Sequence, residues 1–107
     1  DYKSLGIICK TELQAKEIDK QLKIYTDKVY FLSNQSSAFV KGIIITSSHM
    51  AKGLEFDEVI IPLVNSKNYL LEIDKSILYV AVTRAMHKLT LTYCGKKSTF
   101  IDYNAEL

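Results

Sequence analysis

The chain of 107 residues contains no tryptophan, only one proline and only two cysteines. Cys9 and Cys94 lie far apart, each at the end of an apolar run, and neither belongs to a Cys-x-x-Cys pair or a His/Cys cluster. Protein zinc sites are built from such clusters, so we expect no metal ligands in this chain. The pattern is typical of two free thiols in strands of a reduced cytoplasmic protein.

Long hydrophobic runs are also lacking. No apolar stretch approaches the ~18 residues that a membrane span needs, and the start of the chain shows no signal-peptide pattern. We therefore expect a cytoplasmic protein without a membrane partner. Hydrophobic residues make up 48% and charged residues 24% of the chain, as in ordinary soluble domains. Because the chain starts at Asp1 without a methionine, we expect residues 1–107 to be one domain cut from a longer protein.

The chain has little excess of either charge, because 14 basic residues are nearly matched by 12 acidic ones, for a net charge of +2. A dedicated nucleic-acid-binding protein usually carries a clustered basic face. Any contact with nucleic acid must therefore be local, made by a few side chains or by backbone amides.

The signatures of a complete catalytic site are missing too. The segment 95–98 resembles the end of a phosphate-binding P-loop, but Thr90 stands where the first glycine of that motif is required, and no helix follows. There is no nucleophile elbow. Asp57 and Glu58 do not form an acid/base pair, because neighbours in a strand point to opposite sides.

What the sequence does contain is an alternation of apolar runs and helical patterns. The runs predict strands at 5–9, 28–33, 42–46 and 58–62, and an alternating run predicts an edge or half-buried strand at 88–94. Helical spacing predicts helices over 12–25 and 72–87, the first with Thr11 as N-cap and Gln14 in capping-box position. The second helix is expected to have one face made of Ile73, Ile77, Val80 or Ala81, and Arg84. This alternation predicts an α/β domain with a mainly parallel sheet, in which functional loops follow the carboxyl ends of strands.

A polar cluster directly follows the predicted strand 42–46. Gly53 permits a positive φ or a close backbone approach to a ligand. Lys52 adds a positive charge, and the carboxylate of Glu55 can accept hydrogen bonds from ribose hydroxyls. Small donors that suit phosphate oxygens stand at the strand end, namely Thr46, Ser47, Ser48 and His49. The residues alone leave two interpretations open: a site for a nucleotide and a polynucleotide, or a surface loop with an incidental Lys–Glu pair.

A second cluster, TRAMH at 83–87, ends the predicted helix 72–87. The planar fork of Arg84 suits a phosphate held across a domain interface. The alternative is that Arg84 interacts with the helix dipole while its aliphatic stem packs on the core.

Together the two clusters resemble the last two motifs of the UvrD/Rep-type superfamily 1 helicases. Motif V, roughly T-x-H-x-x-K-G-L-E-[FW], is matched by Thr46 or Ser48, His49, Lys52, Gly53, Leu54, Glu55 and Phe56. Motif VI, roughly L-x-Y-V-A-x-T-R-A, is matched by Leu78, Tyr79, Val80, Ala81, Thr83, Arg84 and Ala85. The segment 6–18 is similar to the motif IV region, with Lys10 where arginine is usual. The segment 25–41 is too short for the large subdomain that many members insert before motif V, and this layout is most similar to the HelD-like branch.

The resemblance implies a RecA-like fold and a place in the second motor domain (2A), of which the chain would be the C-terminal part. In that family ATP lies between two such domains, and the N-terminal RecA-like domain of the same chain supplies the P-loop and the Mg²⁺ ligands. Arg84 matches the arginine that reaches the γ-phosphate, and Gly53 and Glu55 match positions near the nucleotide sugar and phosphates. The positions that face single-stranded nucleic acid are matched by Thr46, Ser48, His49 and Lys52. Packing roles inside the domain are implied for Leu54, Phe56 and Tyr79.

The function that follows is that of an ATP-dependent helicase or translocase acting on single-stranded or duplex DNA. One alternative is a HelD-like ATPase that works with RNA polymerase. Another is a non-catalytic module that binds nucleic acid or a partner. The isolated fragment is expected not to hydrolyse ATP, because half of the site would be absent.

Overall fold

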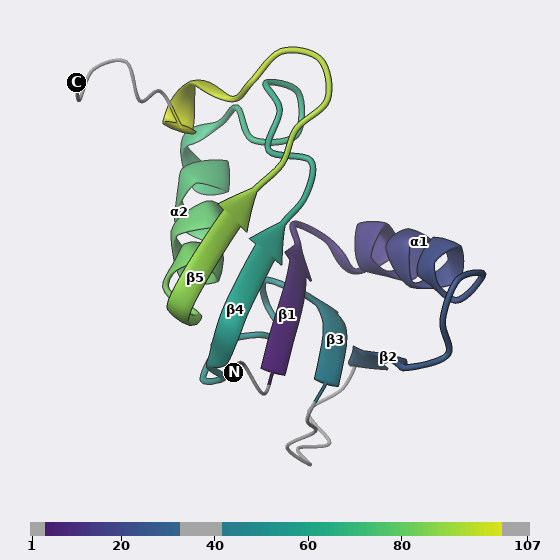
Figure 1. Cartoon of the computed structure of the whole chain (residues 1–107). Coiled ribbons are helices and arrows are strands. Elements are labelled where there is room, and N and C mark those ends of the chain that lie inside the picture. The colour runs from purple at the N-terminus through teal and green to yellow at the C-terminus, as the bar shows by residue number, and fades with distance from the viewer. Residues whose placement is uncertain (1–3, 33–41, 102–107) are drawn as a thin grey trace.

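The computed structural model describes residues 4–32 and 42–101, which form one sheet of five parallel strands in the order β2-β3-β1-β4-β5 (Figure 1). The strands are β1 (Ser4–Cys9), β2 (Val29–Leu32), β3 (Gly42–Ser47), β4 (Phe56–Ile61) and β5 (Ala85–Leu91). The helices are α1 (Glu12–Leu22), α2 (Glu72–Val82) and the short 3-10 helix η1 (Thr99–Ile101). The predicted α/β fold with a mainly parallel sheet is confirmed.

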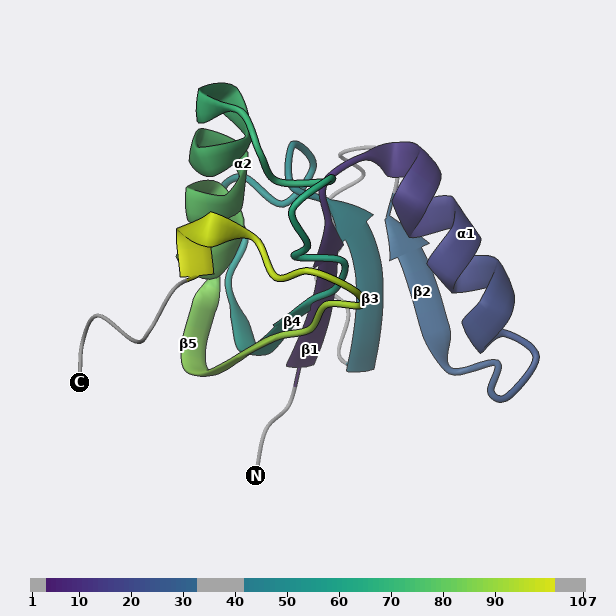
Figure 2. The same ribbon diagram turned by 90° about the horizontal axis from the view of Figure 1, so that it is seen from above.

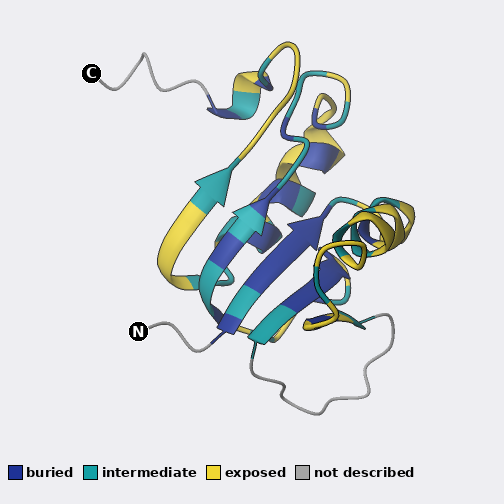
Figure 3. Ribbon diagram, turned by 45° about the vertical axis from the view of Figure 1, so that its right-hand side comes forward, coloured by how far each residue is buried: buried dark blue, intermediate teal, exposed yellow. Residues whose placement is uncertain are grey.

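The two long helices cover opposite faces of this sheet (Figure 2). Successive residues of β1 point to opposite sides: Ile8 belongs to the core cluster that contains Leu78 and Ala81 of α2, whereas Ile7 belongs to the cluster that contains Ala15 of α1. The central strands β1 and β3 are therefore buried on both faces, as their continuous apolar runs predict (Figure 3).

Gly6 in β1 makes room for an aromatic ring on the neighbouring strand. A Cβ at this position would stand 2.6 Å from Cδ2 of Phe56. Phe56 is only 2% exposed, which confirms its predicted place in the core, and Leu54 is partly buried against the same cluster. The start of β4 is thus fixed against β1 by an aromatic ring lying over a glycine.

The predicted helix 72–87 is too long: α2 ends at Val82, and β5 begins at Ala85 instead of residue 88. The hydroxyl of Thr83 donates to the carbonyls of Tyr79 and Val80, so side-chain atoms satisfy the last carbonyls of the helix. Ala85 then pairs with Phe56 of β4, so the chain continues as strand β5. β5 is an edge strand, as predicted.

The buried face of α2 also differs from the prediction. Asp74, Leu78 and Ala81 are buried, whereas Ile73 is 65% exposed. Asp74 turns inward because its carboxylate accepts hydrogen bonds from the amides of Leu70 and Leu71 and pairs with Lys10. Tyr79, expected to pack inside the domain, is 68% exposed.

The remaining sequence predictions differ from the structure in detail. Thr11 caps α1 by accepting from the amide of Gln14, but the Gln14 side chain donates to Asn68 and does not complete the capping box. Both cysteines are free, as expected. Cys9 is buried at the end of β1, whereas Cys94 lies exposed beyond β5 and not within a strand.

Candidate functional site

The segment 48–55, called the motif V loop below, runs from the carboxyl end of β3 to the amino end of β4. The amide of Ser48 donates to the carbonyl of Cys9 at 2.9 Å, and its hydroxyl donates to the carbonyl of Ile77 in α2 at 2.9 Å. Ala51, in the middle of the loop, is fully buried in the core that contains α2. The loop is therefore fastened along α2 and is not a free surface turn.

Two of the predicted nucleic-acid contacts have their hydroxyls engaged inside the domain. Thr46 is fully buried, and its hydroxyl donates to the carbonyl of Leu32 at 2.8 Å. Ser48 is also buried and bonded to α2. Both hydroxyls donate to carbonyls of the domain, so neither donates to a phosphate in this structure. The two residues instead hold the start of the motif V loop to β2 and α2.

The other predicted residues of the loop are exposed, namely His49, Lys52, Gly53 and Glu55. Among the residues that the structure describes, none of the side chains of His49, Lys52 and Glu55 has a hydrogen-bond or ion-pair partner. The Lys–Glu pair of the surface-loop interpretation is therefore not formed. Gly53 has a φ of +83°, as its glycine permits, and a Cβ there would meet nothing within 4 Å.

Arg84 is the single arginine of the chain, which also has 13 lysines. It contacts the end of the motif V loop that precedes β4. Its Nη1 donates to the carbonyl of Leu54 at 3.3 Å, and its own carbonyl accepts from the amide of Phe56 at 2.9 Å. Its Nε donates to the carbonyl of Val80 at 3.1 Å and its Nη2 to the hydroxyl of Thr83 at 3.3 Å. One half-buried side chain thus caps the end of α2 and clamps the loop that precedes β4.

This clamp brings Glu55 next to Arg84, because the two residues on either side of Glu55 are the ones bonded to Arg84. Leu54 and Arg84, which form this contact, lie thirty positions apart in the sequence. Both lie at the amino edge of the sheet, since α2 returns the chain to that edge before β5 begins. His49 follows β3 at the opposite, carboxyl edge. Of the predicted site residues in the loop, those at its start therefore lie at the carboxyl edge, where we expected them, whereas Glu55 lies at the amino edge.

Lys10 lies in a polar network at the carboxyl edge of the sheet. It stands at the position where the motif IV region of the resembling helicases usually has arginine. Its Nζ lies 2.8 Å from Oδ1 of Asp74, donates to the carbonyl of Asn68 at 2.6 Å and stands 5.8 Å from the centre of the Tyr69 ring. The hydrogen bond from Lys10, with those from the amides of Leu71 and Leu70, holds the pKa of Asp74 at about 2, below its usual range. The network joins the turn after β1 to the start of α2.

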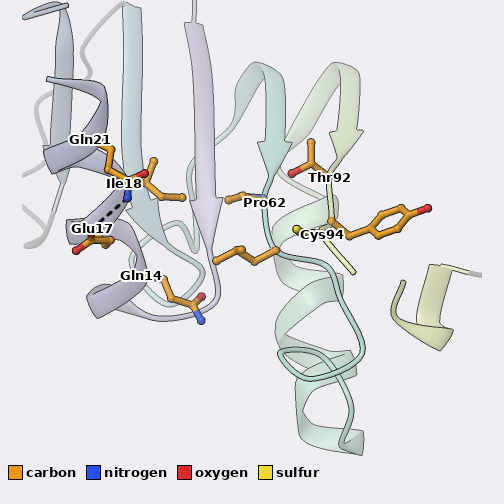
Figure 4. Close-up of a pocket in the computed structure, with 9 residues that line it drawn as sticks. Gln14, Glu17, Ile18, Gln21, Pro62, Thr92 and Cys94 are labelled. Carbon is orange, nitrogen blue, oxygen red and sulfur yellow. Dashed lines mark hydrogen bonds between the residues drawn. The ribbon is translucent and has the colours of Figure 1, made fainter. Parts of the chain in front are cut away.

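A groove of about 360 Å³ lies on the opposite side of the sheet from α2, between α1 and the segments that follow β4 and β5 (Figure 4). Its lining includes Ile18 and Gln14 of α1, together with Pro62, Leu63 and Cys94. No predicted site residue lines it. The exposed residues of the motif V loop, His49, Lys52, Gly53 and Glu55, lie outside it.

Metal and membrane features can be stated for the described ranges 4–32 and 42–101. Within them, no three His, Cys, Asp or Glu side chains are grouped so that they could hold a metal ion. Neither α1 nor α2 combines the length and the apolar character that crossing a membrane requires.

Comparison with known proteins identifies a family and two similar structures. A sequence model of the family described as UvrD-like helicase C-terminal domain matches residues 2–96. The fold is similar to the crystal structure of the C-terminal domain of a possible DNA helicase from Lactobacillus plantarum WCFS1, with a TM-score of 0.81, 35% identity, and coverage of 92% of this chain and 60% of that one. It is also similar to Arterivirus nonstructural protein 10, a helicase in complex with DNA, with a TM-score of 0.53, 13% identity, and coverage of 85% and 22%. No curated protein matches the chain.

Proposed function

The chain belongs to the family of UvrD-like helicase C-terminal domains, and we propose that it forms part of the second motor domain of an ATP-dependent DNA helicase or translocase. The family implies a helicase-type nucleic-acid motor. The chain spans 60% of the length of the similar bacterial domain. We assign the activity to a longer parent protein. In that protein the N-terminal RecA-like domain would complete the site.

The observation that carries the proposal is the hydrogen bond from the Arg84 guanidinium to the carbonyl of Leu54 in the motif V loop, next to the backbone bond from the amide of Phe56 to the carbonyl of Arg84. It links the residue proposed to reach the γ-phosphate directly to the loop that contains Gly53 and Glu55. A change in the partner of the Arg84 guanidinium is therefore transmitted to the motif V loop through the hydrogen bond to Leu54 and no intervening side chain.

The residues at this edge fit a nucleoside triphosphate. A guanidinium has five N–H donors, and three of those of Arg84 are used for Val80, Leu54 and Thr83, so two remain for phosphate oxygens. Glu55 is exposed and can accept from ribose hydroxyls. The absent Cβ of Gly53 leaves space for close approach of a ligand. ATP with Mg²⁺ would supply the phosphoryl group, and the Mg²⁺ ligands are expected in the N-terminal domain.

The mechanism follows from the position of Arg84 on the open surface. Arg84 gains a phosphate partner only when the N-terminal domain closes against this edge, so closure is favoured while the γ-phosphate is present. In related phosphoryl-transfer systems an arginine in this role contributes about 10³–10⁵ in rate. Loss of the γ-phosphate removes the partner of Arg84 and lets the domains separate.

Nucleic acid would be held at the other end of the motif V loop. His49 and Lys52 are exposed and have no competing partner among the described residues, so we assign the direct contacts to them. Thr46 and Ser48 would act by fixing the loop to β2 and α2. Because one short loop joins the two ends, opening and closing at Arg84 changes how the strand is held at His49.

A second candidate function is that of a HelD-like ATPase associated with RNA polymerase. The observation that favours it is the short segment between α1 and β3, which includes β2 and has no room for a large inserted subdomain. This finer branch assignment remains a prediction.

Strand displacement by the parent protein distinguishes the two functions. A helicase hydrolyses ATP faster in the presence of single-stranded DNA and separates a duplex that has a single-stranded tail. A polymerase-associated ATPase hydrolyses ATP but leaves the duplex intact, and that result would contradict the helicase assignment.

A further inference from the structure

Thr83 stands at the point where α2 ends and the chain turns into β5 (Figure 1). It is the C-cap residue of α2, with φ of −81° and ψ of 1°, and Arg84 follows it directly. The backbone of Arg84 therefore lies outside the helix. The orientation of its side chain is not set by a regular helical turn and depends instead on the groups that the guanidinium contacts.

Three acceptors hold the Arg84 guanidinium. Its Nε donates to the carbonyl of Val80 at 3.1 Å, its Nη1 to the carbonyl of Leu54 at 3.3 Å and its Nη2 to the hydroxyl of Thr83 at 3.3 Å. Two of these acceptors belong to the main chain, and among the described residues Thr83 alone supplies a side-chain acceptor. A substitution can therefore remove this contact directly, whereas the other two persist with any side chain at their positions.

The Thr83 hydroxyl is itself oriented by the last turn of α2. It donates to the carbonyls of Tyr79 at 3.0 Å and of Val80 at 2.9 Å. A hydroxyl has one hydrogen and two lone pairs, so its hydrogen points to the helix and a lone pair is left to accept from Arg84. Bonds of this kind, to carbonyls three and four residues earlier, also restrict the χ1 rotamer of threonine. The acceptor for Nη2 is thus in place before any ligand binds.

Val80, Thr83 and Arg84 form a closed set of hydrogen bonds. The carbonyl of Val80 accepts from both the Thr83 hydroxyl and Nε of Arg84, and the Thr83 hydroxyl accepts from Nη2 of Arg84. Two nitrogens of one planar guanidinium are therefore bonded to two oxygens that are bonded to each other. Such an arrangement fixes the plane of the guanidinium and not only the position of its charge.

The plane matters because an arginine binds a phosphate best through two parallel hydrogen bonds. Each terminal nitrogen of a guanidinium has two N–H groups, and Nη1 and Nη2 of Arg84 each use one, for Leu54 and for Thr83. Each therefore keeps one N–H for a phosphate oxygen. Without the Thr83 hydroxyl, Nη2 loses its protein partner, and the plane can turn away from this orientation.

We propose that Thr83 is the positioning residue of the Arg84 guanidinium, whose plane its hydroxyl holds so that Nη1 and Nη2 can both donate to the γ-phosphate. This inference rests on the proposed function and deepens it, because it adds a second side chain that acts on the same phosphate through Arg84. Loss of the hydroxyl should lower kcat for ATP with little change in the KM, since it disturbs the arginine and removes no contact with the rest of the nucleotide.

The test is the DNA-stimulated ATPase activity of the parent protein with substitutions at this position. Thr83→Val keeps the shape of the side chain and removes the hydroxyl, so kcat should fall by about 10-fold, within the roughly 10²-fold that a misplacement of 1 Å can cost. Thr83→Ser keeps the hydroxyl and should keep most of the activity.

Thr26→Val is the matched control. The Thr26 hydroxyl accepts from the amide of Lys28 at 3.1 Å, in the segment before β2 and at the opposite edge of the sheet from β5. This variant also loses one local hydroxyl contact, and it should leave kcat unchanged.

The decisive measurement repeats Thr83→Val in the parent carrying Arg84→Ala, under single-turnover conditions that allow slow hydrolysis to be followed. If Thr83 acts through Arg84, the second substitution should cause no further loss, because the group that it positions is absent. A further loss of the same size would show that Thr83 acts on the fold, and the proposal would be wrong. Equal impairment of Thr83→Ser and Thr83→Val would also overturn it.

The same measurements separate this inference from the proposed function. Unchanged kcat in Thr83→Val, together with a strong loss in Arg84→Ala, removes the positioning role and leaves the proposed function intact. Near-normal hydrolysis by Arg84→Ala alone would contradict the proposed function and the positioning role together.

Discussion

Arg84 and Leu54 are joined by a hydrogen bond of 3.3 Å from the guanidinium to the backbone carbonyl, although thirty residues separate them in the chain. The contact shows that the two alternatives for Arg84 considered from sequence are not exclusive. The side chain caps α2 through Val80, and it also has two N–H donors left for a ligand. The hydrogen bonds to Val80 and Leu54 orient the guanidinium. A phosphate would accept from the two N–H donors that these contacts leave unused.

The buried hydroxyls of the motif V loop provide the first prediction. Thr46→Val and Ser48→Ala each remove one intramolecular hydrogen bond, so each should lower the free energy of unfolding by about 1 kcal/mol. Their effect on oligonucleotide affinity should be smaller than that of His49→Ala or Lys52→Ala, whose side chains are exposed. Denaturant unfolding and fluorescence anisotropy measure the two quantities. A larger loss of affinity from Thr46→Val than from Lys52→Ala would show that the hydroxyl does contact the strand.

Gly53 offers a comparison with a matched glycine. Gly53 and Gly95 have φ values of +83° and +84°, and a Cβ at either would meet nothing within 4 Å. Gly53→Ala and Gly95→Ala should therefore cost similar stability, about 1–2 kcal/mol, because an alanine resists the left-handed region. Only Gly53→Ala should raise the KM for ATP in the parent protein. Equal KM values for the two variants would remove Gly53 from the nucleotide site.

The ion pair of Lys10 and Asp74 predicts a specific response to acid. The folded-state pKa of Asp74 is lowered to about 2, so the pair stabilises the fold above the ordinary aspartate pKa of ~3.9 and loses this contribution as the pH falls toward 2. Asp74→Asn should remove the part of the acid destabilisation that falls between about pH 4 and pH 2. Glu72→Gln, in the same helical turn, should leave the shape of the curve unchanged. Superimposable pH profiles of the native and Asp74→Asn proteins would contradict the pairing.

The two thiols should differ sharply in reactivity. Burial raises the pKa of Cys9 to about 12, whereas Cys94 is exposed. Since the thiolate is the reactive form, a thiol-specific reagent at neutral pH should modify the exposed Cys94 rapidly in the folded protein and the buried Cys9 slowly. Cys94→Ser should abolish the fast phase, and Cys9→Ser should leave it intact. Rapid modification of both thiols would mean that β1 is more open than the structure shows.

The strands and the fold class could be predicted because continuous apolar runs report burial on both faces of a parallel sheet. β1, β2, β3 and β4 differ from the predicted ranges by at most two residues at either end. The end of α2 could not be predicted, because Thr83 and Arg84 continue the helical pattern. What stops the helix is a set of side-chain bonds to its own last carbonyls and the pairing of β5 with β4.

The candidate site was predicted as residue types but not as an arrangement. The two motifs name Gly53, Glu55 and Arg84, yet nothing local in the sequence indicates that Arg84 clamps the loop around Glu55. The engagement of Thr46 and Ser48 with distant carbonyls was equally invisible, since a hydroxyl looks the same whether its partner is a ligand or the backbone. The inward turn of Asp74 depends on Lys10, which lies on another element. In each case the bonding partner lies far away in the sequence and comes close only in the folded domain.

The proposed role of Arg84 is tested most directly by the DNA-stimulated ATPase activity of the parent protein carrying Arg84→Ala. We predict that kcat falls by about 10³-fold or more, with a smaller change in the KM for ATP and with oligonucleotide binding retained. Arg84→Lys should restore little activity, because a lysine keeps the charge but not the planar fork. Protection of the motif V loop from hydrogen exchange, measured in parallel, separates loss of the ligand contact from loss of the clamp on Leu54. A kcat close to that of the unmodified protein would contradict the account.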